Sequence, residues 1–283
     1  MLRSLNSGVS GIQQFQGQMD VIGNNISNVN TTAYKSSRVE FADAFSQTLR
    51  TSAAGSGSTS ATTSLQVGTG VMTTAIENSF NQGSITRTGL PTDLAVSGQG
   101  FFTVRDAVNG ATYATRAGDF RIDSNGYIVT NAGLRVQGFS DSALSARGDI
   151  QINATGAPST AAPGATVASY SFDQQGRVNV RLSDGTEFIR GQILLQNFTD
   201  PQALVKEGNN LYSGLAAAGA LANPDVPGTL GLGRVEAGAL ELSNVDLANE
   251  FATLITTQRA FQACSRIITT SDEMLQELVN LKR

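Results

Sequence analysis

The sequence predicts an α+β fold in which paired N- and C-terminal α-helices, coiled-coil-like, accompany a mainly β domain built from the middle of the chain. Two observations predict this arrangement. Apolar residues recur at three- and four-residue intervals near both ends of the 283-residue chain, which is the spacing of helices that pack along a seam. Between the ends the period changes to alternating apolar and polar residues around turn dipeptides, which is typical of hairpins.

The N-terminal segment carries the first apolar repeat. Gln16 and Gly23 occupy two positions of this repeat, so the predicted seam has two weak places. We expect a helix here, within a terminal helical domain that comprises 1–50 and 240–283. The apolar members of the repeat, after Leu2, are Leu5, Val9, Ile12, Met19 and Ile26.

A segment of low complexity follows the first helical region. Residues 51–64 read TSAAGSGSTSATTS, and no charged residue occurs between Arg50 and Glu77. Small polar residues of this kind are typical of flexible linkers. We expect 51–66 to be a flexible linker or loop that contacts neighbouring subunits.

The middle of the chain is predicted to be β-rich. Turn dipeptides punctuate it, with Asn125-Gly126 as the strongest hairpin signal and Asp184-Gly185 as a second. We expect a β-rich domain over 67–140 and 190–239, and a loop-rich insertion or small outer subdomain over 141–189. The predicted strands fall within 93–104, 119–130, 177–182 and 191–198.

The C-terminal segment repeats an apolar residue every seven positions over five heptads. Ser243 and Asp246 have the spacing of a capping box, which predicts the start of the helix. Phe251 and Val279 fall on the companion heptad position, whose other places hold polar residues. The repeat itself consists of Leu247, Leu254, Phe261, Ile268 and Leu275.

The two terminal helices are expected to pack on each other. An isolated amphipathic helix is marginal in water, because nucleation is costly and exposed apolar side chains forfeit burial. Pairing covers only part of each apolar face, and the remainder is free for contacts between subunits. The alternative is a helical layer packed on the sheet of the same chain.

Composition excludes several kinds of chemistry. The chain has no histidine and one cysteine, so imidazole catalysis and a thiolate metal cage are both excluded. The glycine pairs at 68–70 and 98–100 lack the third glycine of a dinucleotide fingerprint. We expect no cofactor and no metal. Paired carboxylates of a secreted β-rich hydrolase remain the one catalytic alternative, with Asp106, Asp119 and Asp123 as the candidates.

Charge and hydropathy also limit the partners. A net charge of −4 provides no basic surface for nucleic acid. No apolar run approaches the length that spans a bilayer, and the first residues show no secretory signal pattern. We therefore expect neither nucleic-acid binding nor membrane insertion.

Asparagines gather where the first helix is expected to end. Asn24, Asn25, Asn28 and Asn30 lie within seven positions. Asparagine is a good cap and turn former, so these amides are expected to bond the backbone at a helix end. A polar interface between subunits is the second interpretation, and both can hold.

These segments resemble the bacterial flagellar rod and hook proteins. Residues 20–31 fill the pattern D-x-I-G-N-N-I-x-N-x-x-T of that family, and the blocks at 92–104, 113–134 and 243–262 are similar to it in the same order. Ala33-Tyr34 departs from the glycine and aromatic residue usual there. The ending at 267–283 and VQGF at 136–139 are more similar to the short form of the hook protein than to the distal rod.

The resemblance implies a structural protein without enzymatic activity. It would be exported through the flagellar type III apparatus without signal cleavage and would assemble with itself, helically, into the hook, a flexible tube that transmits motor torque to the filament. The distal rod, a rigid drive shaft, is the alternative. Implied partners are the rod, hook cap and hook-filament junction proteins, and the implied location is the flagellar hook or basal body. The expected assembly residues are the two apolar repeats with Phe251, Asn24, Asn25 and Asn28.

Overall fold

The computed structural model describes residues 2–52, 60–159, 161–162, 164–220 and 224–281. The chain divides into two compact units, each assembled from separated segments. We call Met1–Ser27, Ser36–Ser79 and Asp246–Arg283 the helical unit, and Asn28–Lys35 with Phe80–Val245 the β unit. The predicted α+β class, with paired terminal helices and a mainly β middle, is confirmed.

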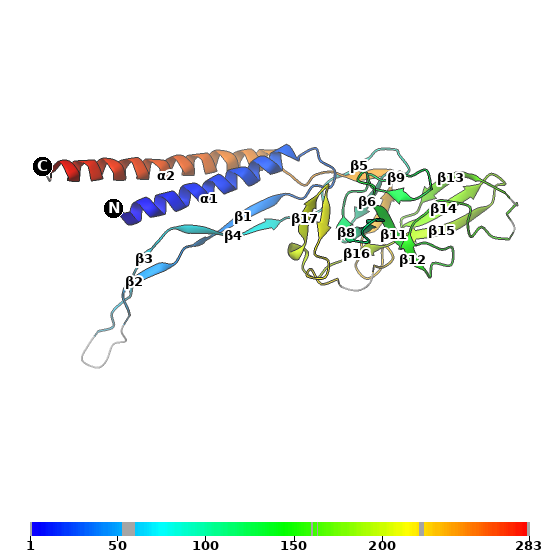
Figure 1. Ribbon diagram of the computed structural model, residues 1–283, viewed down its shortest axis with the longest axis horizontal. Coiled ribbons are helices and arrows are strands. Elements are labelled where there is room, and N and C mark those ends of the chain that lie inside the picture. Colours follow the sequence, from blue (N-terminus) through cyan, green and yellow to red (C-terminus); the bar gives the residue numbers. More distant parts are fainter. Residues whose placement is uncertain (1, 53–59, 160, 163, 221–223, 282–283) are drawn as a thin grey trace. The chain divides into compact units, whose positions relative to one another are not determined.

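The helical unit contains both long helices, which pack along each other. Helix α1 spans Leu2–Ser27 and α2 spans Leu247–Leu281. They run in opposite directions, because Gly8 near the start of α1 approaches Ile268, whereas Asn25 near its end reaches Glu250 at the start of α2. Figure 1 shows the blue and red helices side by side, with both chain ends at the same end of the pair. None of the described helices has an apolar stretch long enough to cross a bilayer.

Two short antiparallel pairs of strands complete the helical unit. Strand β1 (Ser37–Asp43) pairs with β4 (Val71–Asn78), and β2 (Ser46–Arg50) pairs with β3 (Leu65–Gly68). The structure thus differs from the expectation of a helical segment over 1–50 and a loop over 51–66. The physical reason is the alternation of apolar and polar residues in SRVEFAD, which suits a strand. Residues 53–59 of the expected linker lie outside the described residues.

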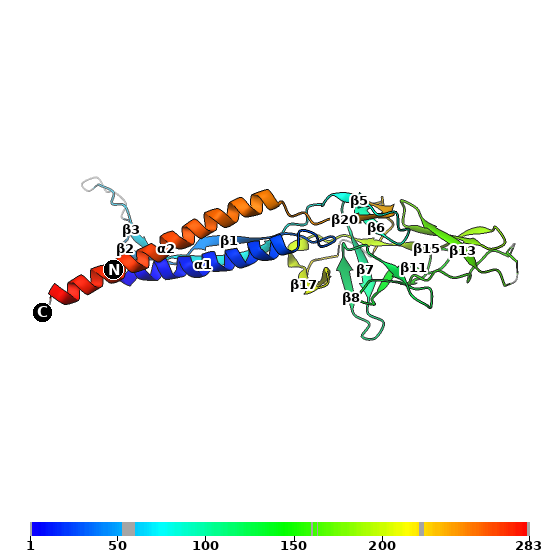
Figure 2. The same cartoon turned by 90° about the horizontal axis from the view of Figure 1, so that it is seen from above.

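The β unit is organised around one antiparallel sheet. Its main path runs β13-β14-β15-β11-β7-β8-β18-β17. The bounds along this path are β13 Val167–Phe172, β14 Arg177–Leu182, β15 Glu187–Ile193, β11 Arg135–Phe139, β7 Phe101–Arg105, β8 Thr112–Thr115, β18 Leu211–Ser213 and β17 Val205–Gly208. Figure 2 shows these strands from a second direction.

Shorter elements extend the sheet or form separate pairs. Strands β9, β10, β12 and β16 extend the main sheet: β10 pairs with both β9 and β11, β12 pairs with β11, and β16 pairs with β7. Two separate pairs are formed by β19 with β6 and by β20 with β5. These elements are β5 Ile85–Arg87, β6 Leu94–Ser97, β9 Arg121–Ile122, β10 Ile128–Val129, β12 Arg147–Asp149, β16 Leu195–Gln196, the 3-10 helix η1 Pro201–Ala203, β19 Arg234–Ala237 and β20 Ala239–Glu241.

The core of the β unit comes from the alternating segments. Phe102, Val104, Ile128, Val180 and Leu195 are almost fully buried in one apolar cluster. The strand predictions are confirmed, because each of the four segments contains at least one strand of the structure. Within 141–189, strands β12, β13 and β14 and the start of β15 belong to the main sheet rather than to a separate subdomain.

The turns and the helix start show how local sequence determines local structure. Gly126 adopts a φ of 83° and donates to the Asp123 carbonyl, so the predicted Asn125-Gly126 turn is confirmed. The helix cap differs by three residues from the prediction. The Asp246 carboxylate accepts from the backbone amides of Ala248 and Asn249, so Asp246 rather than Ser243 caps α2.

Candidate assembly interface

The surface of α2 that faces α1 repeats every seven residues. One row of this surface consists of four of the predicted apolar residues. The other row begins at Glu250, one residue before Phe251, where the sequence predicted the companion row. All of these side chains are buried or half-buried. The two rows alternate at intervals of four and three residues, which is the spacing of an antiparallel seam. They are Leu254, Phe261, Ile268 and Leu275 in one row, and Glu250, Thr257, Cys264 and Ser271 in the other.

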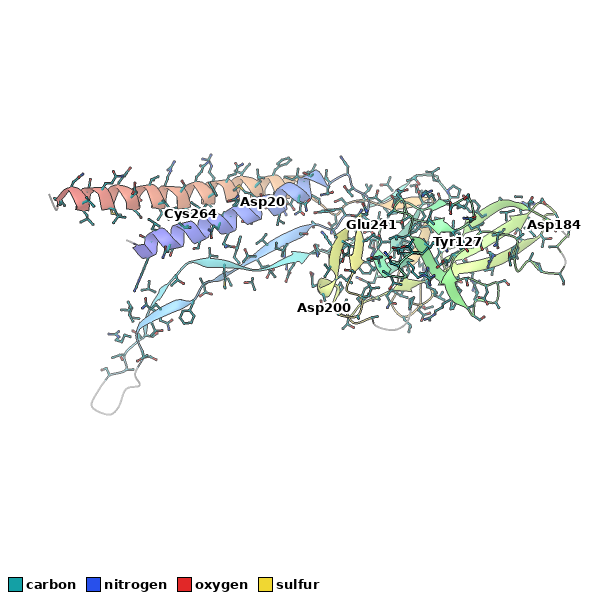
Figure 3. All side chains as sticks on the ribbon, in the orientation of Figure 1. Asp20, Tyr127, Asp184, Asp200, Glu241 and Cys264 are labelled. Carbon is teal, nitrogen blue, oxygen red and sulfur yellow. The ribbon has the colours of Figure 1, made fainter. Side chains whose placement is uncertain are left out.

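On α1 the closest approach to α2 uses small residues. A Cβ placed on Gly11 would lie 2.9 Å from the Cys264 Sγ atom, which Figure 3 labels on α2. A Cβ on Gly8 would lie 3.2 Å from the Ile268 side chain. Ile22 and Asn25 continue this face at helical spacing and are buried. The two glycines let the helix backbones come close together.

The predicted apolar repeat of α1 is displaced from this face by one residue toward the C-terminus, so that Val9 follows Gly8 and Ile12 follows Gly11. Leu5, Ile12, Met19 and Ile26 are half-buried, whereas Val9 is 37% exposed. On α2, Leu247 and Phe251 lie outside the seam and are 39% and 50% exposed. The structure therefore brings part of the predicted interface together within one chain and leaves these three apolar side chains facing outward.

Asn25 joins three elements of the helical unit. Its side chain is buried and exchanges two hydrogen bonds with the Ser37 backbone, at 2.8 Å to the carbonyl and 3.0 Å from the amide. The same amide nitrogen donates to the Glu250 carboxylate at 3.0 Å. Burial raises the pKa of Glu250, while the bond from Asn25 acts in the opposite direction. Asn25 thus has the backbone-bonding role expected at a helix end.

The neighbouring asparagines have different environments. Asn24 is exposed on α1. Asn28 lies in the β unit, where its carbonyl accepts from the Thr31 amide and its side chain from the Thr31 hydroxyl.

Large apolar side chains on more than one side of α2 remain uncovered within the described chain. We call them the outer set, and they are 44–65% exposed. Several large apolar side chains that are open to water on one helix are typical of interaction surfaces. The outer set consists of Phe251, Ile255, Ile267, Met274, Leu278 and Val279.

The paired strands of the helical unit present a second apolar surface. Their inner face contacts α1, where the Phe15 and Phe41 rings meet edge to face at 6.0 Å and the Thr73 hydroxyl donates to the Gln14 side chain. Met72 directly precedes Thr73 on β4 and so points to the other face. Exposed apolar side chains on these strands and their connections are Phe45, Leu49, Leu65, Met72 and Ile76.

The candidate catalytic carboxylates each accept hydrogen bonds from different neighbouring residues. Asp106 accepts from the Val108 amide, and Asp123 from the Ser124 amide. Asp119 accepts from the Asn131 side chain, and burial raises the pKa of Asp119. In the part of the chain that the structure describes, no three His, Cys, Asp or Glu side chains are placed to hold a metal ion.

Family models match three parts of the chain. A flagellar basal body rod model matches residues 5–35, a D1-domain model of the flagellar hook protein FlgE/F/G matches residues 95–180, and a FlgEFG C-terminal model matches residues 236–281. Their order follows the N-terminal helix, the β unit and the C-terminal helix.

Curated relatives match over the whole length. The flagellar basal-body rod protein FlgG of Bacillus subtilis (strain 168) is 40% identical over 283 residues, covering all of both chains, and that of Borreliella burgdorferi is 36% identical, again over all of both chains. The flagellar hook protein FlgE of Borreliella burgdorferi is 26% identical over an alignment of 444 positions that covers both chains. This chain belongs to the flagellar rod and hook protein family.

Proposed function

We propose that this protein is a structural subunit of the distal flagellar rod, which transmits torque as a rigid shaft. The observation that carries the proposal is the end-to-end similarity to rod proteins of nearly the same length. The hook, which the sequence motifs favoured, is the second candidate. It is less supported because the hook relative is 26% identical and its alignment needs 444 positions, whereas this chain has 283 residues.

The geometry supports a role in helical self-assembly. The helix pair keeps an apolar outer set that a neighbouring copy would bury, at about 25 cal/mol per Å² of apolar area removed from water. The exposed face of the paired strands offers a second contact. Identical copies joined by such unlike surfaces form an open helical filament when the rotation between them does not close into a ring.

The wider setting follows from the same proposal. The protein acts in the flagellar basal body as a non-enzymatic component. It meets other rod subunits and, at the distal end, the hook. It reaches this position through the flagellar type III export apparatus without cleavage of a signal.

Electron microscopy of the concentrated, purified full-length protein tests the proposal. We expect straight rods after a precipitating salt is added. Curved tubes would instead support the hook, and catalytic turnover of polysaccharide by a persistent monomer would favour the hydrolase alternative.

Expression in two Bacillus subtilis strains separates rod from hook inside a cell. One strain lacks the FlgG relative and the other lacks its hook protein. We expect this chain to restore swimming only in the first strain. Restoration only in the second would contradict the rod assignment.

A further inference from the structure

A buried ion pair lies in the β unit, apart from the helix seam. The Lys35 and Glu241 side chains are both fully buried, and the Lys35 Nζ atom is 2.6 Å from the Glu241 Oε1 atom. Arg116, also buried, places a guanidinium nitrogen 3.6 Å from Glu241 Oε2. Figure 3 labels Glu241 within the β unit. A buried ion pair is costly to form, so its position calls for a physical explanation.

That position coincides with the places where the chain passes between its two units. The chain crosses after residues 27, 35, 79 and 245. Three short segments of the β unit therefore border the crossings: 28–35, 80–84 and 241–245. Lys35 belongs to the first segment and Glu241 to the third.

The second segment bonds to both members of the pair. The Lys35 Nζ atom donates to the Asn81 carbonyl at 2.8 Å, and the Gly83 amide donates to Glu241 Oε1 at 2.8 Å. Packing is tight here, because a Cβ placed on Gly83 would lie 2.1 Å from the Leu242 carbonyl oxygen. One lysine and one glutamate thus contact all three segments.

Backbone hydrogen bonds link the first and third segments directly. The Ala33 amide donates to the Glu241 carbonyl at 2.8 Å, and the Asn244 amide donates to the Tyr34 carbonyl at 3.3 Å. The Asn244 side chain reaches the Asn81 carbonyl at 3.1 Å. Each segment therefore bonds to the other two.

Charge explains why Glu241 is suited to the centre of this arrangement. Two buried cations, Lys35 and Arg116, face its single carboxylate. Burial lowers the pKa of both cations, and the attraction of Glu241 opposes that shift. Loss of Lys35 leaves one cation against one anion, whereas loss of Glu241 leaves two cations without a counter-ion.

We propose that Lys35 and Glu241 form a joint that ties the three segments into one cooperative element, so that all four crossings loosen or hold together. The joint itself is a property of the folded chain. All of its contacts lie within the β unit, so it does not depend on the proposed function.

Hydrogen exchange of the full-length protein tests the joint, because each segment contains one reporter amide. The reporters are the amides of Ala33, Gly83 and Asn244. In Lys35→Met we expect all three to exchange at least about tenfold faster, while peptides from β7 and β8 keep their protection. The matched control is Arg181→Met, which removes an exposed cation of the same unit and leaves the three reporters unchanged.

A second variant approaches the joint from the second segment and leaves both charged side chains in place. Gly83→Ala pushes the second segment away from Leu242, and we expect faster exchange at Ala33, which it does not contact. If each variant loosens only the segment that it alters, or if no reporter changes, the joint is refuted. Either result leaves the rod assignment standing, because assembly is read separately by microscopy.

Discussion

At the scale of single residues, glycine decides how closely the two helices approach. Gly8 and Gly11 face α2 at positions where a side chain would meet Ile268 or Cys264. Gly17 lies on the same helix with open space where its Cβ would be. The same residue type therefore has a packing role at one position of α1 and only a conformational cost at another.

This contrast yields a matched pair of substitutions. Gly17→Ala is expected to stabilise the protein by about 0.5–1 kcal/mol, because alanine favours the helix. Gly11→Ala gains the same propensity but crowds Cys264, so we expect it to be less stable than Gly17→Ala by about 1–3 kcal/mol. Thermal unfolding of the two variants measures the difference. Equal stabilities would show that the seam is looser at Gly11 than the structure indicates.

At the scale of elements, the apolar side chains of α2 have two different environments. Leu254 lies in the seam with α1, whereas Ile255, the next residue, belongs to the outer set. Successive helical positions are separated by about 100°, so a substitution at Leu254 tests folding of the helix pair and one at Ile255 tests assembly of copies.

Leu254→Asp is expected to open the helix pair and abolish polymerisation while the β unit stays folded, because it buries an unpaired charge. Ile255→Asp is expected to keep the monomer's helix content and abolish polymerisation alone. Circular dichroism of the monomer and sedimentation after concentration measure the two effects.

Thr270→Asp is the control for both, since it adds the same charge at an exposed position of α2. It should change neither helix content nor assembly. Normal filaments from Leu254→Asp would refute the seam, and normal filaments from Ile255→Asp would remove the outer set from the interface.

At the scale of the whole molecule, low charge is the property that matters for assembly. Charged residues make up 15% of the chain, against about 25% in ordinary soluble domains. The candidate contact surfaces are apolar, so ion pairs supply little of the expected attraction between copies.

Assembly is therefore expected to depend on the kind of salt rather than on ionic strength. Between about 50 and 500 mM sodium chloride the critical concentration should change less than about twofold, because screening removes few contacts. Ammonium sulfate should lower it, since excluded salts strengthen apolar burial. Sedimentation of filaments measures the critical concentration in each of the two salts. Dissolution in sodium chloride would indicate that ion pairs hold the subunits together.

Much of this architecture was predictable from local pattern. The presence of both helices, the strands of the β unit and the Asn125-Gly126 turn follow from the spacing of apolar residues and from turn chemistry, which act over a few positions. The alternation of SRVEFAD likewise indicates the strand β1, although a helical motif stands before it in the sequence.

The sequence alone thus determined the fold class, the two amphipathic helices and, through its motifs, the family. Only the tertiary structure decided which face of α1 forms the seam, that Asn25 meets Glu250, and that Lys35 meets Glu241. These pairs are separated by 225 and 206 positions along the chain. The physical reason is that periodicity in the sequence defines the apolar face of one helix. Where two helix backbones come closest depends on where small side chains of distant segments meet, and the local pattern does not contain that information.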